Sequence, residues 1–152
     1  MISSPSPTVP SSGFSLIDLM ITIVIASVLT AIAIPVYRDH TQRSRIAEAT
    51  SQLLIMKLQL EQYYQDNRNY GAGVDGSNCG VTLPAQNNFI YTCTVNNVGQ
   101  SYLLNANGLA ARGMQEFKFS LNEAGLQRTS RLPITWGLAP LNCWVVKRGM
   151  TC

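Results

Sequence analysis

The four cysteines are the side chains with the most reactive chemistry in this sequence. They are Cys79, Cys93, Cys143 and Cys152. Cysteine pairs either ligate a metal ion or oxidise to disulfides. Zinc sites usually contain CxxC pairs, but no such pair is present, and the single histidine, His40, lies far from the cysteines in the sequence. We therefore expect no metal site, and two disulfides formed in an oxidising compartment.

The pairing of the cysteines is open at this point, because four cysteines allow three connectivities. We favour the local pairing, Cys79 with Cys93 and Cys143 with Cys152, because each ring would then be short. This pairing would tie down the loop that contains Cys79 and would close the end of the chain into a second loop.

Catalytic chemistry has few candidate residues. Downstream of residue 70 the carboxyl groups are those of Asp75, Glu116, Glu123 and the C-terminus, while His40 lies much earlier. Nucleophilic catalysis needs a nucleophile and a base within hydrogen-bond reach of each other. No such constellation is indicated, so we expect a protein that is not an enzyme and needs no cofactor.

Cations are unevenly placed in this chain of net charge +3, since residues 125–152 contain four cations and no acidic side chain. These cations are Arg128, Arg131, Lys147 and Arg148. A patch of this sign attracts anions such as nucleic-acid phosphates. Trp136 and Trp144 are candidate groups for stacking on bases. The alternative is a set of scattered, solvated surface cations.

One carboxylate, Asp18, lies inside the longest apolar run, residues 14–36. As a helix this run would span roughly 34 Å, enough to cross a bilayer. A soluble helix of this length normally keeps a polar stripe, and this one is apolar all round. A carboxylate in lipid is costly and needs a partner, such as the free amino group of a neighbouring chain. A position of Asp18 at the membrane interface is the alternative.

The helix is expected to continue beyond the apolar run. Pro35 removes a backbone hydrogen bond and should kink it. Apolar residues then recur at near-heptad spacing up to residue 66, which predicts an amphipathic helix and a total helical length of roughly 50 residues. The apolar positions are Ile46, Ala49, Leu53, Met56, Leu60 and Tyr63.

Strand patterns follow a loop rich in glycine, asparagine and proline that runs to about residue 88. The predicted strands are residues 89–95, 101–107, 116–121 and 126–131, with a hairpin turn at 122–125. We expect an α+β fold in which the helix packs on a four-stranded antiparallel sheet. Residues 132–152 are predicted to form an irregular loop stapled to the sheet, with a short strand at 144–146.

Residues 1–13 are rich in serine and proline and lack apolar periodicity, which predicts a leader that is disordered or removed. The segment GFSLIDLM, residues 13–20, with the apolar helix and Pro35, resembles the class III signal of type IV pilins and pseudopilins. The resemblance implies cleavage after Gly13 and methylation of the new N-terminus at Phe14. It also implies that Asp18 directs subunit assembly by pairing with the Phe14 amine.

Two further segments, EQYYQDNRNY at residues 61–70 and NCWVVKRGMTC at 142–152, look like minor pilins of the PilE type from β-proteobacteria. The resemblance implies the type IV pilin fold with a disulfide-closed C-terminal loop, which supports the pairing of Cys143 with Cys152. The implied division of the chain is a leader at 1–13, a transmembrane and polymerisation helix at 14–36, its amphipathic continuation at 37–70 and a globular head at 71–152.

The implied function is that of a structural, minor subunit of a type IV pilus that serves pilus assembly, adhesion, motility or DNA uptake. Its partners would be other pilin subunits, a prepilin peptidase that is also the N-methyltransferase, and the inner-membrane assembly machinery. Its place would be the inner membrane with a periplasmic head, and then the extracellular pilus. The alternatives are a DNA- or surface-binding minor pilin that uses the basic C-terminal region, and a type II secretion pseudopilin.

Two features depart from the family pattern. Asp18 stands where the family usually has glutamate, which shortens the reach of the carboxylate by roughly 1.5 Å. The leader also lacks the basic residue that usually precedes the cleavage glycine. The positive-inside rule alone would favour the reverse topology, because three arginines follow the helix. We give more weight to the cysteines and the signal motif. The arginines are Arg38, Arg43 and Arg45.

Overall fold

The computed structural model describes residues 15–71, 79–96 and 98–152. The leader, with its cleavage site at Gly13 and the methylation site at Phe14, lies outside the described residues. The chain divides between Asp39 and His40 into two compact units, which we describe separately. The helix α1, Leu16–Asn67, contributes residues to both.

The first unit consists, in its described part, of the apolar half of α1. By length and composition α1 is the one helix among the described residues that could cross a membrane. Its hydroxyl side chains donate to carbonyls one turn back: Thr22 to Leu19 (2.8 Å) and Ser27 to Val24 (2.7 Å). These bonds satisfy polar groups that would be costly in hydrocarbon. Asp18 lies in the first turn of α1, and Pro35 lies inside the helix.

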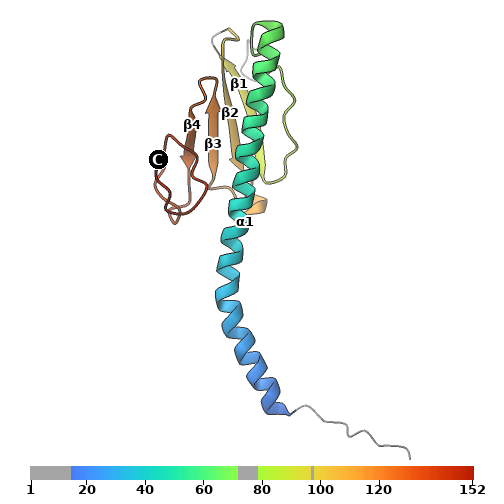
Figure 1. The fold of residues 1–152 in the computed structure, drawn as a ribbon, viewed down its shortest axis with the longest axis vertical. Helices are drawn as coiled ribbons and strands as arrows, with labels where there is room; N and C mark the ends of the chain where they lie inside the picture. Colours follow the sequence, from blue (N-terminus) through green and yellow to red (C-terminus); the bar gives the residue numbers. More distant parts are fainter. Residues whose placement is uncertain (1–14, 72–78, 97) are drawn as a thin grey trace, which may run out of the picture. The chain divides into compact units, whose positions relative to one another are not determined.

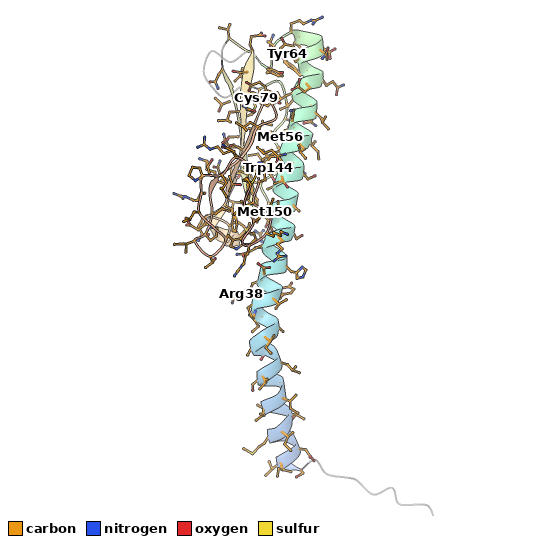
Figure 2. The ribbon with its side chains drawn as sticks, turned by 60° about the vertical axis from the view of Figure 1, so that its left-hand side comes forward. Arg38, Met56, Tyr64, Cys79, Trp144 and Met150 are labelled. Atoms are coloured by element: carbon orange, nitrogen blue, oxygen red, sulfur yellow. A yellow bond between two sulfur atoms is a disulfide. The ribbon has the colours of Figure 1, made fainter. Side chains whose placement is uncertain are left out.

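The second unit begins with the amphipathic half of α1, which carries the predicted apolar seam. The side chains of the seam are fully buried except that of Tyr63, which is half-buried. Tyr63 covers Gly80 of the following loop, whose missing side chain leaves room for the tyrosine ring. The fully buried positions are Ile46, Ala49, Leu53, Met56 and Leu60. Figure 2 labels Met56 on α1.

A four-stranded antiparallel sheet in the order β1-β2-β3-β4 packs against this half of α1, as predicted (Figure 1). Its strands are β1 (Phe89–Asn96), β2 (Ser101–Gly108), β3 (Lys118–Asn122) and β4 (Gln127–Arg131). The turn predicted at 122–125 closes with the amide of Gly125 donating to the carbonyl of Asn122 at 3.0 Å. Alternate side chains of the strands enter the core, which accounts for the period of two in the sequence.

Two details of the sheet differ from expectation. β3 begins at Lys118 rather than at residue 116, because the amide of Phe117 donates to the carbonyl of Met114 in a turn. That turn follows the short 3-10 helix η1, Ala110–Arg112. A bulge between Lys118 and Phe119 then shifts the register with β4, so that Lys118 lies opposite Arg131 while Phe119 lies opposite Thr129.

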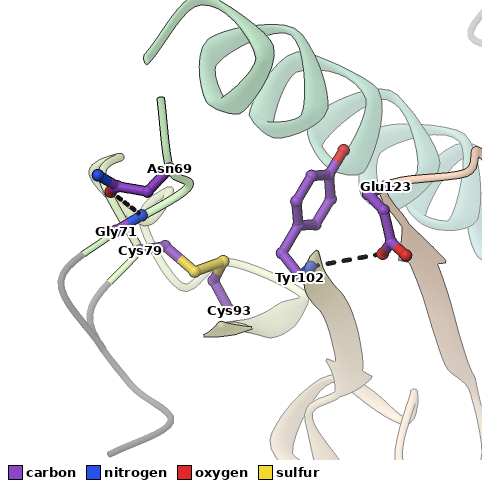
Figure 3. Close-up of a disulfide and its surroundings, with 6 residues drawn as sticks. All are labelled: Asn69, Gly71, Cys79, Cys93, Tyr102 and Glu123. Carbon is purple, nitrogen blue, oxygen red and sulfur yellow. Dashed lines mark hydrogen bonds between the residues drawn. A yellow bond between two sulfur atoms is a disulfide. The ribbon is translucent and has the colours of Figure 1, made fainter. Parts of the chain in front are cut away.

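Both disulfides join the cysteines as we had favoured, Cys79 with Cys93 and Cys143 with Cys152. Figure 3 shows the first, which links the loop before β1 to β1 itself. Close to this link the chain turns, because the amide of Gly71 donates to the side chain of Asn69 at 3.0 Å.

The strand expected at residues 144–146 is absent; the chain there is irregular. Thr129 of β4 instead holds this segment through its side chain, which donates to the carbonyl of Cys143 (2.6 Å) and accepts from the amide of Val145 (3.0 Å). Its backbone exchanges two 2.9 Å bonds with Leu141. These contacts satisfy the polar groups without a ladder of strand pairs.

Candidate anion-binding face of the sheet

Three cations gather on the face of the sheet that points away from the core, which we call the outer face. Lys118 comes from β3, and Arg128 and Arg131 come from β4; all three are exposed. Strand alternation accounts for Lys118 and Arg128, because each is the neighbour of a buried residue, Phe119 in β3 and Thr129 in β4. Arg131 reaches the same face because the bulge makes Ser130 an extra residue between Thr129 and Arg131. The register places Arg128 opposite Ser120 and Arg131 opposite Lys118.

The outer face is hollowed by two adjoining grooves that share Lys118 and Ser130. One, of about 410 Å³, also includes Arg131, and the other, of about 330 Å³, includes Arg128. The remaining lining is mainly polar and includes Asn105 of β2. The carboxylate-bearing residue Glu116 lines a neighbouring hollow together with Arg131. The grooves therefore offer cations and amide groups to an extended anion.

The structure brings together only part of the predicted basic patch. Arg128 and Arg131 lie on the outer face, whereas Lys147 and Arg148 belong to the C-terminal loop and line neither groove. The guanidinium of Arg148 lies 5.9 Å from the centre of the Trp136 ring, a cation–π contact. Lys118 was missed by sequence reasoning. Its alternation with Phe119 in the predicted strand was the signal that could have placed it on this face.

The expectation that the tryptophans stack on bases is wrong, because both are buried. Trp136 is 1% exposed, and its ring meets Phe117 edge to face at 5.0 Å between centroids. Trp144 is 7% exposed, and its indole nitrogen donates to the carbonyl of Ser120 at 2.9 Å. Figure 2 labels Trp144. Both rings are core residues, and an anion on the outer face would meet cations rather than aromatic rings.

A second polar cluster lies where α1 ends. The hydroxyls of Tyr70 and Tyr102 donate to the carboxylate of Glu61 at 3.2 and 3.3 Å, and the two rings meet edge to face. Burial first, and then the charge of Glu61, raise the pKa of Tyr70 to about 12. The same causes raise the pKa of Tyr102 further. Figure 3 shows that the amide of Tyr102 also donates to Glu123 (3.4 Å). These contacts fasten the helix end to β2.

Comparison with known families shows where the chain belongs. A family model described as type IV minor pilin ComP, DNA uptake sequence receptor, matches residues 35–116. The chain belongs to this type IV minor pilin family. The prediction of a type IV pilin is thereby confirmed. The matched residues end before β3, so the three cations of this pilin's outer face lie outside the match.

Curated relatives of this pilin are pilus and fimbrial proteins. Type IV major pilin protein PilE1 of Neisseria gonorrhoeae is 35% identical over 88 residues, which are 56% of this chain and 40% of that protein. Fimbrial protein EcpC of Eikenella corrodens is 33% identical over 94 residues, which are 62% and 60% of the two chains. The pilin thus spans less than two thirds of the length of these relatives.

Two solved structures are similar at low sequence identity. A type IV pilin from Shewanella oneidensis is 20% identical with a TM-score of 0.48, over 68% of this chain and 97% of the other. The minor pilin PilV of Neisseria meningitidis is 22% identical with a TM-score of 0.47, over 62% and 91%. The fold described above rests on the helix, the sheet and the disulfides of this chain itself.

Proposed function

We propose that this protein is a minor subunit of a type IV pilus, anchored in the inner membrane by the apolar half of α1 and assembled through it. The observation that carries this proposal is family membership together with an N-terminal helix whose apolar side chains are exposed. Ile17, Met20 and Ile32, for example, are 65 to 70% exposed. Such side chains need lipid or other helices around them.

The proposed life of the subunit has two stages. A prepilin peptidase cuts after Gly13 and methylates Phe14, and the head stays in the periplasm while the helix spans the membrane. Helices of many subunits then pack together, so that lipid contacts are exchanged for protein contacts at small hydrophobic cost. Asp18 sets the register of neighbouring subunits by pairing with the amine of Phe14 in the adjacent subunit. The assembly machinery of the inner membrane drives the exchange.

Mass spectrometry of filaments sheared from cells tests both stages at once. An N-methylated peptide that begins at Phe14 is the expected result. A chain found in filaments with an intact leader would contradict the processing step. A chain that is processed but absent from pili, and whose loss impairs protein secretion, would instead support the pseudopilin alternative.

A second function, DNA binding, is favoured by a specific observation, the grouping of Lys118, Arg128 and Arg131 on the outer face. The family to which the chain belongs is described as a DNA uptake sequence receptor. Because the tryptophans are buried, we propose that binding relies on phosphate contacts with duplex DNA rather than on stacking with single strands. Binding of duplex DNA to the wild type and to Lys118→Gln across salt concentrations tests this function.

A further inference from the structure

A second group of cations, which we call the arginine cluster, lies at the other end of the second unit from the tyrosine–carboxylate contacts. It consists of Arg43 and Arg45 of α1 and Arg112, the last residue of η1. The side chain of Arg45 donates to the backbone carbonyl of Arg112 at 2.7 Å, although the two residues are 67 positions apart. This bond holds η1 beside α1, where Figure 1 shows it as a short orange helix.

The surroundings of Arg112 leave its guanidinium accessible. Arg43 and Arg112 are exposed, and Arg45 is half-buried. The neighbours of Arg112 in the chain, Ala111 and Gly113, carry little or no side chain, and the space around Gly113 is open to 4 Å. The exposed side chain of Arg112 is therefore within reach of an anion from solvent.

Two carboxylates belong to the same stretch of α1, and both are half-buried. Glu48 accepts a 2.8 Å hydrogen bond from the side chain of Asn88. Asp39 lies one turn before Arg43 in the helix. The exposed side chains here, Arg43 and Arg112, are therefore cationic, and the two carboxylates beside the cluster are half-buried.

The chemistry of the cluster favours phosphate, because a guanidinium presents paired N–H groups that match phosphate oxygens. Its place in the chain indicates the source. Arg43 and Arg45 follow Val36, the end of the apolar run, by seven and nine residues. At about 1.5 Å per residue this is roughly 10 to 14 Å of helix. Long arginine side chains can reach back over part of that length towards the headgroup layer of a bilayer.

We propose that Arg43, Arg45 and Arg112 bind the phosphates of anionic phospholipid headgroups and so hold the head on the membrane surface before the subunit enters a filament. The proposal rests on the proposed membrane anchoring. It does not depend on which leaflet of the membrane the head faces. It also gives a binding role to arginines that follow the membrane span, which the positive-inside rule considers only as determinants of membrane orientation. A subunit that leaves the membrane must release these headgroups.

Arginine accessibility in a bilayer tests the proposal. The full-length chain is reconstituted in nanodiscs of phosphatidylcholine alone, or of phosphatidylcholine mixed with phosphatidylglycerol. Modification of each arginine by phenylglyoxal is then followed by mass spectrometry. We expect Arg112 to react about fivefold more slowly with phosphatidylglycerol present, the effect of one cation near an anionic surface. Arg68, which is exposed just after the end of α1, is the internal control and should react equally in both.

Two variants separate the cluster from general charge. Arg45→Gln removes the bond that holds η1, and we expect it to abolish most of the protection of Arg112. Lys147→Gln changes the net charge equally, at a residue that lines neither groove, and should leave that protection intact. Circular dichroism of both variants checks that the head is folded. If Arg45→Gln does not fold, Arg112→Gln gives an independent test, in which the modification of Arg43 is measured.

The outcomes are distinguishable. A chain that does not co-elute with nanodiscs overturns the anchoring, and the lipid site with it. A chain that co-elutes but shows equal reaction of Arg112 in both lipids overturns the lipid site alone. Equal protection by free inorganic phosphate in neutral nanodiscs would show a general phosphate site. Stronger protection by duplex DNA than by phosphatidylglycerol would assign the cluster to nucleic acid; either result overturns the lipid assignment.

Discussion

Lys118 of β3 lies directly opposite Arg131 of β4, because the bulge between Lys118 and Phe119 lengthens the β4 side of the pair. Like charges that face each other across two strands destabilise a sheet. An anion bound between them would relieve this repulsion. The pairing is therefore a physical reason to expect that the outer face binds phosphate. It also means that removing one of the two cations should stabilise the fold, which is not expected of an isolated surface cation.

Replacing Lys118 should have opposite effects on folding and on DNA binding. We expect Lys118→Gln to raise the free energy of unfolding by about 0.2 to 1 kcal/mol, since it removes the like-charge pair. The same variant should weaken binding to duplex DNA. Three phosphate contacts predict a slope of about −2.7 in log K against log salt, and the variant should reduce it to about −1.8. Fluorescence anisotropy across salt concentrations measures both slopes.

Lys147→Gln is the matched control for this measurement, because Lys147 lies in the C-terminal loop and lines neither groove. It removes the same charge and should leave the slope unchanged. An equal loss of affinity in both variants would mean that net charge, not the outer face, attracts DNA.

Asp18 should be needed for assembly but not for membrane insertion. We expect Asp18→Ala and the isosteric Asp18→Asn to remain in the membrane fraction and to be depleted from sheared filaments, because neither can pair with an amine. Asp18→Glu keeps the charge with a longer reach and should enter filaments at least as well as the wild type. Immunoblots of the two fractions give the ratio. Incorporation of Asp18→Ala at the wild-type level would refute the role.

Trp136 should matter for stability and not for nucleic acid. Its ring is 1% exposed and packs against Phe117, so we expect Trp136→Ala to lower the free energy of unfolding by about 3 to 5 kcal/mol. Ile134 lies in the same loop but is 84% exposed, and Ile134→Ala should change stability by less than about 0.5 kcal/mol. Denaturant titration compares the two. Similar small losses would show that the loop does not belong to the core.

The head should lose stability in alkaline solution through its buried tyrosines. An ordinary tyrosine has a pKa near 10, whereas the pKa of Tyr70 in the fold is about 12 and that of Tyr102 is raised further. The folded state holds these protons more tightly than the unfolded state. Their contribution to stability is therefore complete below pH 10 and is lost as the pH rises towards 12 and beyond.

Thermal unfolding at a series of pH values from 8 to about 12 measures this loss. The double variant Tyr70→Phe with Tyr102→Phe lacks both phenols and should show a shallower decline than the wild type, although it starts from a lower stability because Glu61 loses both donors. Parallel declines in the two proteins would mean that other groups cause the alkaline loss.

Those parts of the fold that a repeating pattern encodes were predictable from the sequence. The near-heptad spacing from Ile46 to Leu60 marks the buried side of α1, and alternation marks the four strands, because in both cases burial follows the geometry of the backbone. The local disulfide pairing also holds. Asp18 and Pro35 were identified from the residues themselves, as the one carboxylate of the apolar run and a proline inside the helix, and the assembly role of Asp18 stays a prediction.

The remainder depends on contacts between distant segments. Trp144 looked available for stacking until the carbonyl of Ser120, 24 residues away, proved to be its partner. The strand expected at residues 144–146 fails because the side chain of Thr129 satisfies that backbone. The pairing of Lys118 with Arg131 requires a bulge whose position no local pattern reveals. A short apolar or basic run does not reveal which distant segment it contacts. The candidate site is built from such runs, so it is the part of the fold that the sequence predicts least well.

Thr129 bonds to Leu141 through its backbone and to Cys143 and Val145 through its side chain, so the segment after β4 is fixed at its far end as firmly as at its start. Between these points Leu132 and Trp136 are buried in the core, whereas Ile134 and Leu138 are exposed. Selection that acts on the surface of the protein can therefore change exposed positions such as Ile134 and Leu138, but not Trp136. The cationic strands beside this segment would keep their spacing throughout such diversification.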